Sequence, residues 1–181
     1  MAESFSNSLK RAAGIMTSSA SCSVGITTNL ITGISTVGVA VSDFIDNTHY
    51  IAGTKVLNFG TSASQIVADR NSTNDSAATG QTVKLLGPTT CYTSTSGEKA
   101  ILIGGTFANN TTQEVNVTVS IYDNSTGTES SIAQKIPVPN GSSFVIADTG
   151  KVLLESLDEA RVYCDTENAI DFNLSILKGV S

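Results

Sequence analysis

One nine-residue stretch, Glu114 to Tyr122, most strongly constrains the fold of this chain. Its sequence, Glu-Val-Asn-Val-Thr-Val-Ser-Ile-Tyr, places β-branched apolar residues at every second position. Because successive side chains of a strand point to opposite faces, this alternation predicts a strand with one buried face and one polar face that meets water or a partner. Residues 170–176 repeat the pattern. Two such strands must bury their apolar faces against a second sheet, so the pattern predicts a β-sandwich or a small barrel.

The composition favours the same all-β fold class. Ser, Thr, Asn and Gly are abundant and Trp is absent among the 181 residues. Ser, Thr and Asn compete with the helix backbone for hydrogen bonds, so they favour strands and polar turns. With a net charge of −6 and ten basic residues, the chain has no electrostatic footprint for nucleic acid or an anionic membrane. No stretch approaches the roughly 18 to 20 apolar residues of a membrane span.

Turn and break signals divide the chain into three predicted parts. We expect an N-terminal arm over residues 1–20, a small β domain over 21–87 and an antiparallel β-sandwich domain over 88–181. The boundary falls at Gly87-Pro88, because proline cannot donate to a sheet and favours an extended residue before it. After this boundary, turn signals recur about every eight to twelve residues, which is typical of a sandwich.

The expected arm has more than one interpretation. Phe5, Leu9 and Ala13 fall at helical spacing beside Lys10 and Arg11, which is compatible with a short helix. An isolated helix of this length is only marginally stable in water. The alternatives are therefore a frayed terminus and an arm that becomes ordered against a neighbouring subunit.

The sequence shows no pattern typical of catalysis, so we expect no enzyme and no catalytic, cofactor-binding or metal-binding residues. His49 is the only histidine, and it lies in a polar loop, where it is a poor candidate for a Ser-His-Asp triad or a zinc site. Carboxylates cluster late in the chain, at Asp158, Glu159, Asp165, Glu167 and Asp171. Such residues could bind calcium or hydrolyse glycosides. Without a calcium-loop motif, we expect a solvated acidic edge instead.

Three cysteines, Cys22, Cys91 and Cys164, are far apart in sequence and form no Cys-x-x-Cys pair, which argues against a zinc knuckle or a redox motif. We expect three reduced thiols that behave as small apolar residues in a cytoplasm, with a Cys91–Cys164 disulfide as the alternative. No apolar core after Lys10 and Arg11 could serve as a signal peptide, so we expect synthesis and folding in the cytoplasm.

Two groups of segments carry a resemblance to known proteins. The later group comprises Ile136-Pro-Val-Pro-Asn-Gly-Ser-Ser-Phe-Val-Ile, Lys151-Val-Leu-Leu-Glu, Arg161-Val-Tyr and Ala169-Ile-Asp-Phe-Asn-Leu-Ser-Ile-Leu. This group resembles small virion structural proteins of tailed bacteriophages, especially marine cyanophages. The earlier group resembles a short β module of phage structural and tail-associated proteins, and comprises Thr32-Gly-Ile-Ser-Thr-Val-Gly-Val-Ala-Val and Ile51-Ala-Gly-Thr-Lys-Val. Together they span most of residues 25–178, as patterns of turns and apolar alternation rather than catalytic signatures.

The resemblance implies a role on the virion and transfers no active site. It implies a capsid decoration (cement) protein bound to the head surface, or alternatively a component of the neck, tail or fibre, including a module that binds host glycans. The implied partners are major capsid or neck and tail proteins, together with further copies of the same chain. A polar, charge-poor β surface suits such contacts, because they desolvate few charges. The low aromatic content, 6% with no Trp, argues against sugar stacking.

Overall fold

The computed structural model describes residues 3–180, with the backbone alone for residues 147–150. Strands make up 61% of the chain, all named strand pairs are antiparallel, and the described range contains no helix, which confirms the all-β fold class. Among these residues there is accordingly no helix long and apolar enough to cross a membrane. The chain divides into two compact units, one formed by the residues up to Gly14 and from Pro88 onward, the other by Ile15–Gly87.

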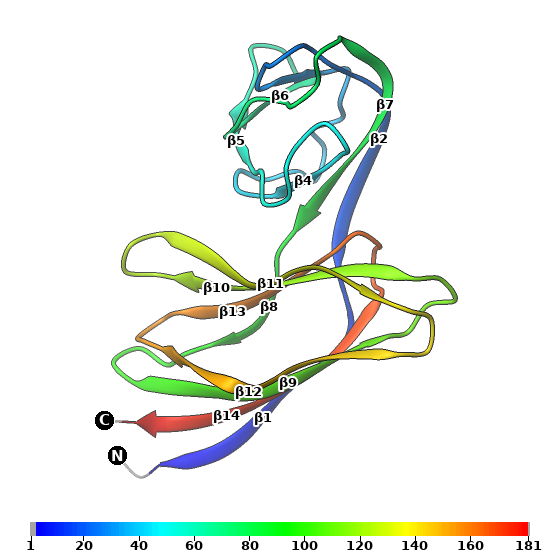
Figure 1. The fold of residues 1–181 in the computed structure, drawn as a ribbon. Helices are drawn as coiled ribbons and strands as arrows, with labels where there is room; N and C mark the ends of the chain where they lie inside the picture. The colour runs from blue at the N-terminus through cyan, green and yellow to red at the C-terminus, as the bar shows by residue number, and fades with distance from the viewer. Residues whose placement is uncertain (1–2, 181) are drawn as a thin grey trace. The chain divides into compact units, whose positions relative to one another are not determined.

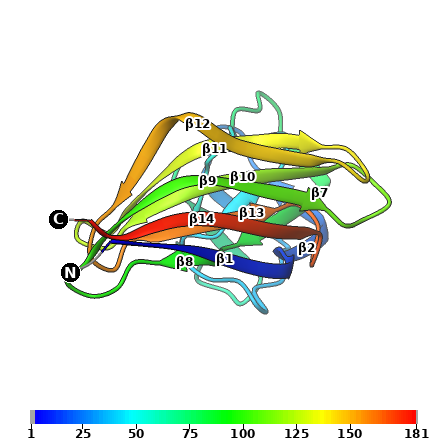
Figure 2. The same cartoon turned by 90° about the horizontal axis from the view of Figure 1, so that it is seen from below.

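The first unit, which we name the eight-stranded unit, consists of two four-stranded sheets (Figures 1 and 2). The first sheet has the strand order β1-β14-β9-β12, and the second has the order β11-β10-β13-β8. The strands are β1 (Ser4–Ala13), β8 (Thr89–Thr93), β9 (Lys99–Asn109), β10 (Val115–Asp123), β11 (Thr128–Val138), β12 (Ser143–Leu154), β13 (Glu159–Cys164) and β14 (Ile170–Val180).

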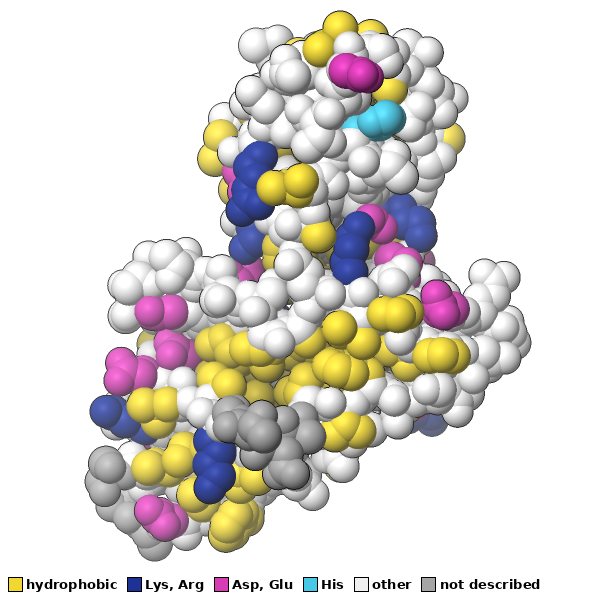
Figure 3. All heavy atoms as spheres, viewed as in Figure 1, with side chains coloured by type: hydrophobic (Ala, Val, Ile, Leu, Met, Phe, Trp, Pro, Cys, Tyr) yellow, Lys and Arg dark blue, Asp and Glu magenta, His cyan; other side chains and the backbone are white. Residues whose placement is uncertain are grey.

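Both sheets of this unit contribute side chains to one hydrophobic core. Val115, Val117 and Val119 of β10 are at most 1% exposed, which confirms the buried face predicted for this strand. Apolar residues of β14 belong to the same cluster, among them Leu174 and Ile176. Burying one such side chain contributes about 1.5–3 kcal/mol. Figure 3 shows further hydrophobic side chains gathered on the visible side of this unit, and partly buried residues of β11 and β12 pack against the core.

The N-terminal residues do not form the separate arm or short helix that the sequence suggested. Ser4–Ala13 is strand β1, which pairs with the last strand in the register Phe5 to Leu177 and Leu9 to Asn173. A spacing of four residues fits one face of a helix and also one face of a strand, so the apolar spacing could not decide between them. The pairing with β14 makes this segment a strand. Because β14 is far away in the sequence, the local apolar spacing could not reveal this pairing.

The second unit, which we name the six-stranded unit, is inserted in sequence between β1 and β8. It has its own core, in which Ile31, Ile66 and Val83 are fully buried. Its single sheet has the strand order β4-β7-β2-β3-β6-β5. The strands are β2 (Ile15–Val24), β3 (Leu30–Thr32), β4 (Phe44–Asp46), β5 (Val56–Phe59), β6 (Gln65–Ala68) and β7 (Ala78–Gly87).

Gly14 ends the first segment of the eight-stranded unit in a conformation that requires glycine. Its φ is +122°, and a Cβ built on it would lie 2.7 Å from the carbonyl oxygen of Thr166. Its N–H donates to Oγ1 of Thr89 at 3.2 Å, and its carbonyl accepts from the N–H of Asn168 at 3.0 Å. A side chain at this position would therefore clash with backbone and disturb both bonds.

Candidate interaction surface

The first sheet directs an unbroken row of apolar side chains away from the core. Strand register places Phe5 opposite Leu177, Leu177 opposite Ile101, and Ile101 opposite Leu153, across all four strands. The adjacent Ile176 and Leu154 are buried in the core, so alternation directs the row outward, toward the viewer of Figure 2. Phe5 is 79% exposed and Leu153 is 47% exposed. We name these four residues the apolar row.

A second cross-strand row on the same face mixes apolar and polar residues. Leu9 lies opposite Asn173, Asn173 opposite Thr106, and Thr106 opposite Val145. Leu9 and Val145 are 68% and 53% exposed. The outer face of the first sheet therefore presents exposed apolar side chains at both edge strands, β1 and β12.

Two oppositely charged pairs lie near the two ends of this face. Lys99 Nζ lies 3.6 Å from a carboxylate oxygen of Glu155, and Arg11 Nε lies 3.8 Å from one of Asp171. Exposed pairs of this kind contribute little to stability, but within each pair the two charges compensate one another. An exposed apolar area with few uncompensated charges is typical of a surface that binds protein.

The outer face of the second sheet is different, because its polar side chains are buried and bonded to one another. Glu129 of β11, with a side chain only 3% exposed, accepts hydrogen bonds from the hydroxyls of Ser120 and Tyr163, the latter at 2.8 Å. Arg161 lies 3.8 Å from the Glu129 carboxylate and donates to Glu159 at 2.8 Å. We name Ser120, Glu129, Arg161 and Tyr163 the Glu129 cluster. The polar side of β10 is therefore covered at Ser120 rather than open to water.

The protonation states in the Glu129 cluster follow from its burial and its charges. Burial raises the pKa of Tyr163 well above its usual value, and the nearby negative charge of Glu129 raises it further. Burial alone would lower the pKa of Arg161, but its hydrogen bond to Glu159 and the charges of Glu159 and Glu129 outweigh burial and raise it. The guanidinium also lies over the ring of Tyr122, 3.9 Å from its centroid. A neutral Tyr163 and a charged Arg161 thus compensate the buried carboxylate of Glu129. This arrangement stabilises the sheet and does not indicate catalysis.

The late carboxylates do not form the solvated acidic edge expected from the sequence. Asp158 and Asp165 are 6% and 9% exposed, and both accept hydrogen bonds from backbone N–H groups. Glu159 pairs with Arg161, Asp171 bonds the Ala12 N–H at 2.8 Å, and Glu167 is exposed in a turn. Asp158 and Asp165 therefore fix turns and strand ends. The described residues contain no group of three or more potential metal ligands.

The three cysteines are free thiols, so the alternative of a Cys91–Cys164 disulfide is wrong. All three are buried, and burial raises the pKa of the Cys91 thiol far above its usual value. A thiol in this state is a poor nucleophile. His49 is partly exposed, and its backbone carbonyl accepts from the N–H of Thr73 at 2.8 Å.

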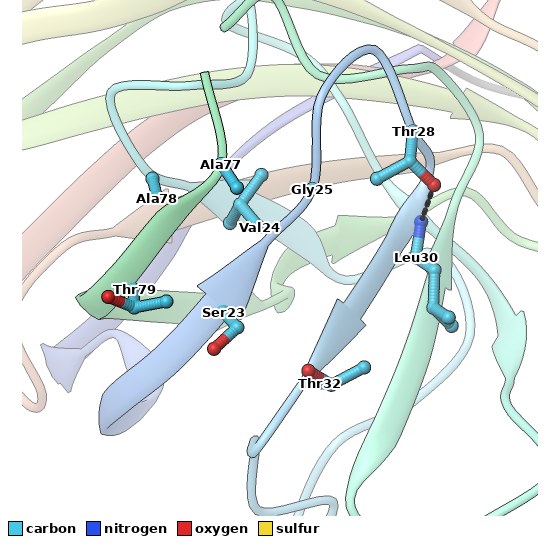
Figure 4. A pocket seen from close by; sticks show the side chains of 9 residues that line it. All are labelled: Ser23, Val24, Gly25, Thr28, Leu30, Thr32, Ala77, Ala78 and Thr79. Atoms are coloured by element: carbon cyan, nitrogen blue, oxygen red, sulfur yellow. Dashed lines mark hydrogen bonds between the residues drawn. The ribbon is translucent and has the colours of Figure 1, made fainter.

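The six-stranded unit has a shallow depression of about 240 Å³ where β2 lies between β3 and the start of β7 (Figure 4). The hydroxyl of Thr28 at its rim accepts from the N–H of Leu30 at 3.2 Å, so it is already engaged. The lining has no aromatic or charged side chain, which leaves neither a stacking surface for a sugar nor a charge for an ionic ligand. It consists of Ser23, Val24, Gly25, Thr28, Leu30, Thr32, Ala77, Ala78 and Thr79.

The apolar row is the site that the sequence interpretation missed, although a signal for it was present. Ala100-Ile101-Leu102-Ile103 and Val152-Leu153-Leu154 are continuous apolar runs, whereas a strand with one polar face needs apolar residues only at alternate positions. Such runs indicate apolar side chains on both faces of a strand. No protein-family model and no curated protein matches this chain.

Proposed function

We propose that this chain is a non-enzymatic structural protein of a tailed-bacteriophage virion, acting as a decoration protein bound to the head surface. The observation that carries the proposal is the outer face of the first sheet, with its exposed apolar row and the two ion pairs near its ends. A repeated particle surface offers many equivalent positions at which such a face becomes buried. The resemblance of the two groups of segments to phage virion proteins supports the same role.

The proposal includes a fold and a location. The two sheets of the eight-stranded unit form an antiparallel β-sandwich, supported by their common hydrophobic core. The protein is made in the host cytoplasm and becomes part of the virion, where its partners are the major capsid protein and other copies of itself. The alternative location is the neck, tail or fibre, where the same face would bind the proteins of those structures.

Mass spectrometry of gradient-purified particles tests the virion role. We expect the chain to co-purify with intact particles at high copy number, and its absence from them would end the proposal. Images of particles that carry a labelled copy separate the two locations. Label over the head supports decoration, whereas label confined to one vertex or to the tail moves the protein to the alternative location.

A matched pair of variants tests the surface itself. Leu153→Asp places a charge in the apolar row, and Ile132→Asp places one at a similarly exposed position on β11, 42% exposed against 47% for Leu153. We expect Leu153→Asp to weaken binding to undecorated particles by about tenfold or more, and Ile132→Asp to change it by less than about twofold. Equal effects of the two variants would show that the apolar row is not the contact.

A further inference from the structure

β1 has a strand neighbour on one side only, because it is the edge strand of the first sheet (Figure 2). A long exposed edge is a template for pairing with another strand unless charges, prolines or bulges protect it. In β1 such protection is confined to the later part, where Lys10 and Arg11 precede a register shift. The earlier residues, Ser-Phe-Ser-Asn-Ser-Leu, contain no charge and no proline.

The sequence of this edge is complementary to itself. In an antiparallel pair of two β1 strands centred on Asn7, Glu3 of each copy lies opposite Arg11 of the other. In the same register Phe5 of each copy lies opposite Leu9 of the other, and Asn7 lies opposite its own counterpart. Phe5, Asn7, Leu9 and Arg11 are alternate residues of β1 and share one face, and continuing the strand by one residue beyond Ser4 places Glu3 on the same face. The pairing therefore joins opposite charges and covers Phe5 and Leu9, which are 79% and 68% exposed.

Neighbouring registers lack this match. Centring the pair on Ser6 places Glu3 opposite Leu9 and leaves Phe5 opposite Asn7. Centring it on Ser8 places Phe5 opposite Arg11. Each alternative sets a charge against an apolar side chain, so the sequence selects the register centred on Asn7.

We infer that the partner of this edge is β1 of a second copy of the chain, bound antiparallel around a two-fold axis at Asn7. The two first sheets then form one continuous antiparallel sheet of eight strands. Arg11 can take part, because its side chain is 94% exposed and its contact with Asp171 is long, at 3.8 Å. Two chains that each carry a charge of −6 repel one another overall, and the reciprocal pairs between Glu3 and Arg11 offset this repulsion where the chains meet.

This contact goes beyond the proposed virion role and can fail separately from it, because it is measured on the isolated chain in solution. Sedimentation over a range of concentrations should show a reversible equilibrium between one chain and two. Wild-type protein that remains a single chain at about 100 μM would overturn the inference, whatever the composition of the particles.

A cysteine at the two-fold axis tests the register. In the proposed pair the two Asn7 Cα atoms lie about 4.5–5.5 Å apart, within the range of a disulfide. Mild oxidation should therefore cross-link Asn7→Cys into dimers, while the native cysteines, being buried, do not interfere. The matched control is Asn173→Cys, an exposed position on the same face of β14. Its two copies would lie about 20 Å apart, because they are three strand spacings apart across the sheet and four residues apart along it. Equal cross-linking of both variants would contradict the register.

Charge reversal tests the pairing of Glu3 with Arg11. Glu3→Lys and Arg11→Glu should each weaken dimerisation by about tenfold, because each places like charges opposite one another. The double variant restores opposite charges and should recover most of the lost affinity. Circular dichroism confirms that each variant keeps its strands, and a double variant weaker than both single variants would overturn the pairing.

Discussion

The outer face of the second sheet buries charged side chains that satisfy one another, whereas the outer face of the first sheet exposes apolar side chains. In the second sheet, Glu129 is compensated by Arg161 and by the hydroxyls of Ser120 and Tyr163. In the first sheet, Phe5 and Leu153 are exposed at the two edge strands. The comparison teaches that a buried charged cluster need not be a catalytic site. The surface that remains available to a partner is the outer face of the first sheet, which is the less polar of the two.

Among the variants that test this difference between the two faces, we expect Arg161→Met to have the largest effect on stability. The substitution removes the guanidinium that lies 3.8 Å from the buried carboxylate of Glu129, so we expect the free energy of unfolding to fall by about 3 kcal/mol. Denaturant unfolding measures the loss. The matched control, Arg11→Met on the first sheet, removes an exposed arginine and should cost less than about 0.5 kcal/mol. Equal losses would show that the two faces do not differ in this way.

An intermediate effect is expected at alkaline pH, because the pKa of Tyr163 is raised in the folded protein. An unfolded tyrosine releases its proton near pH 10, while folded Tyr163 keeps it. Its contribution to stability is therefore fully present below about pH 10 and is lost as the pH rises above that value. We expect Tyr163→Phe to reduce the dependence of the melting temperature on pH between about 9 and 11.

Tyr50→Phe, in the six-stranded unit, is the comparison variant for this measurement. The pKa of Tyr50 is raised to about 12 by burial. We expect Tyr50→Phe to reduce the dependence of the melting temperature on alkaline pH by less than Tyr163→Phe does. The reverse order would mean that the negative charge of Glu129 does not act on Tyr163.

The smallest effect is expected from Asp171→Asn on the first sheet. The pKa of Asp171 is lowered mainly by the hydrogen bond from the Ala12 N–H. The hydrogen bond from the Asn110 side chain and the positive charge of Arg11 lower it further. A lowered folded pKa gives stability that is present above the unfolded value, near 3.9, and is lost as the pH falls through the folded value. The variant should therefore lose less stability than the wild type in acid unfolding between about pH 5 and 2. A steeper acid loss in the variant would contradict this assignment.

Local alternation allowed the strands to be predicted, but not the arrangement of the faces. The buried valines of β10 follow from sequence, because a period of two residues directs them to one side. The fate of Ser120, on the opposite side, depends on Glu129 and Tyr163, which come from other strands. β1 was missed for the same reason, since its partner lies at the other end of the sequence. The sandwich and the virion role remain predictions.

The pairing of β1 with β14 has a consequence for the order in which the molecule is made. The six-stranded unit is one uninterrupted segment, Ile15–Gly87, so all its strands leave the ribosome before β8 does. β1 emerges before the strands of this unit but must wait for about 160 further residues, or roughly 10–30 s of synthesis, before β14 is available. The inserted unit can therefore complete its folding while the first sheet, whose strands come before and after it in the sequence, is still unfinished. A chain whose synthesis stops before Ile170 lacks β14, the only neighbour of β1 in that sheet.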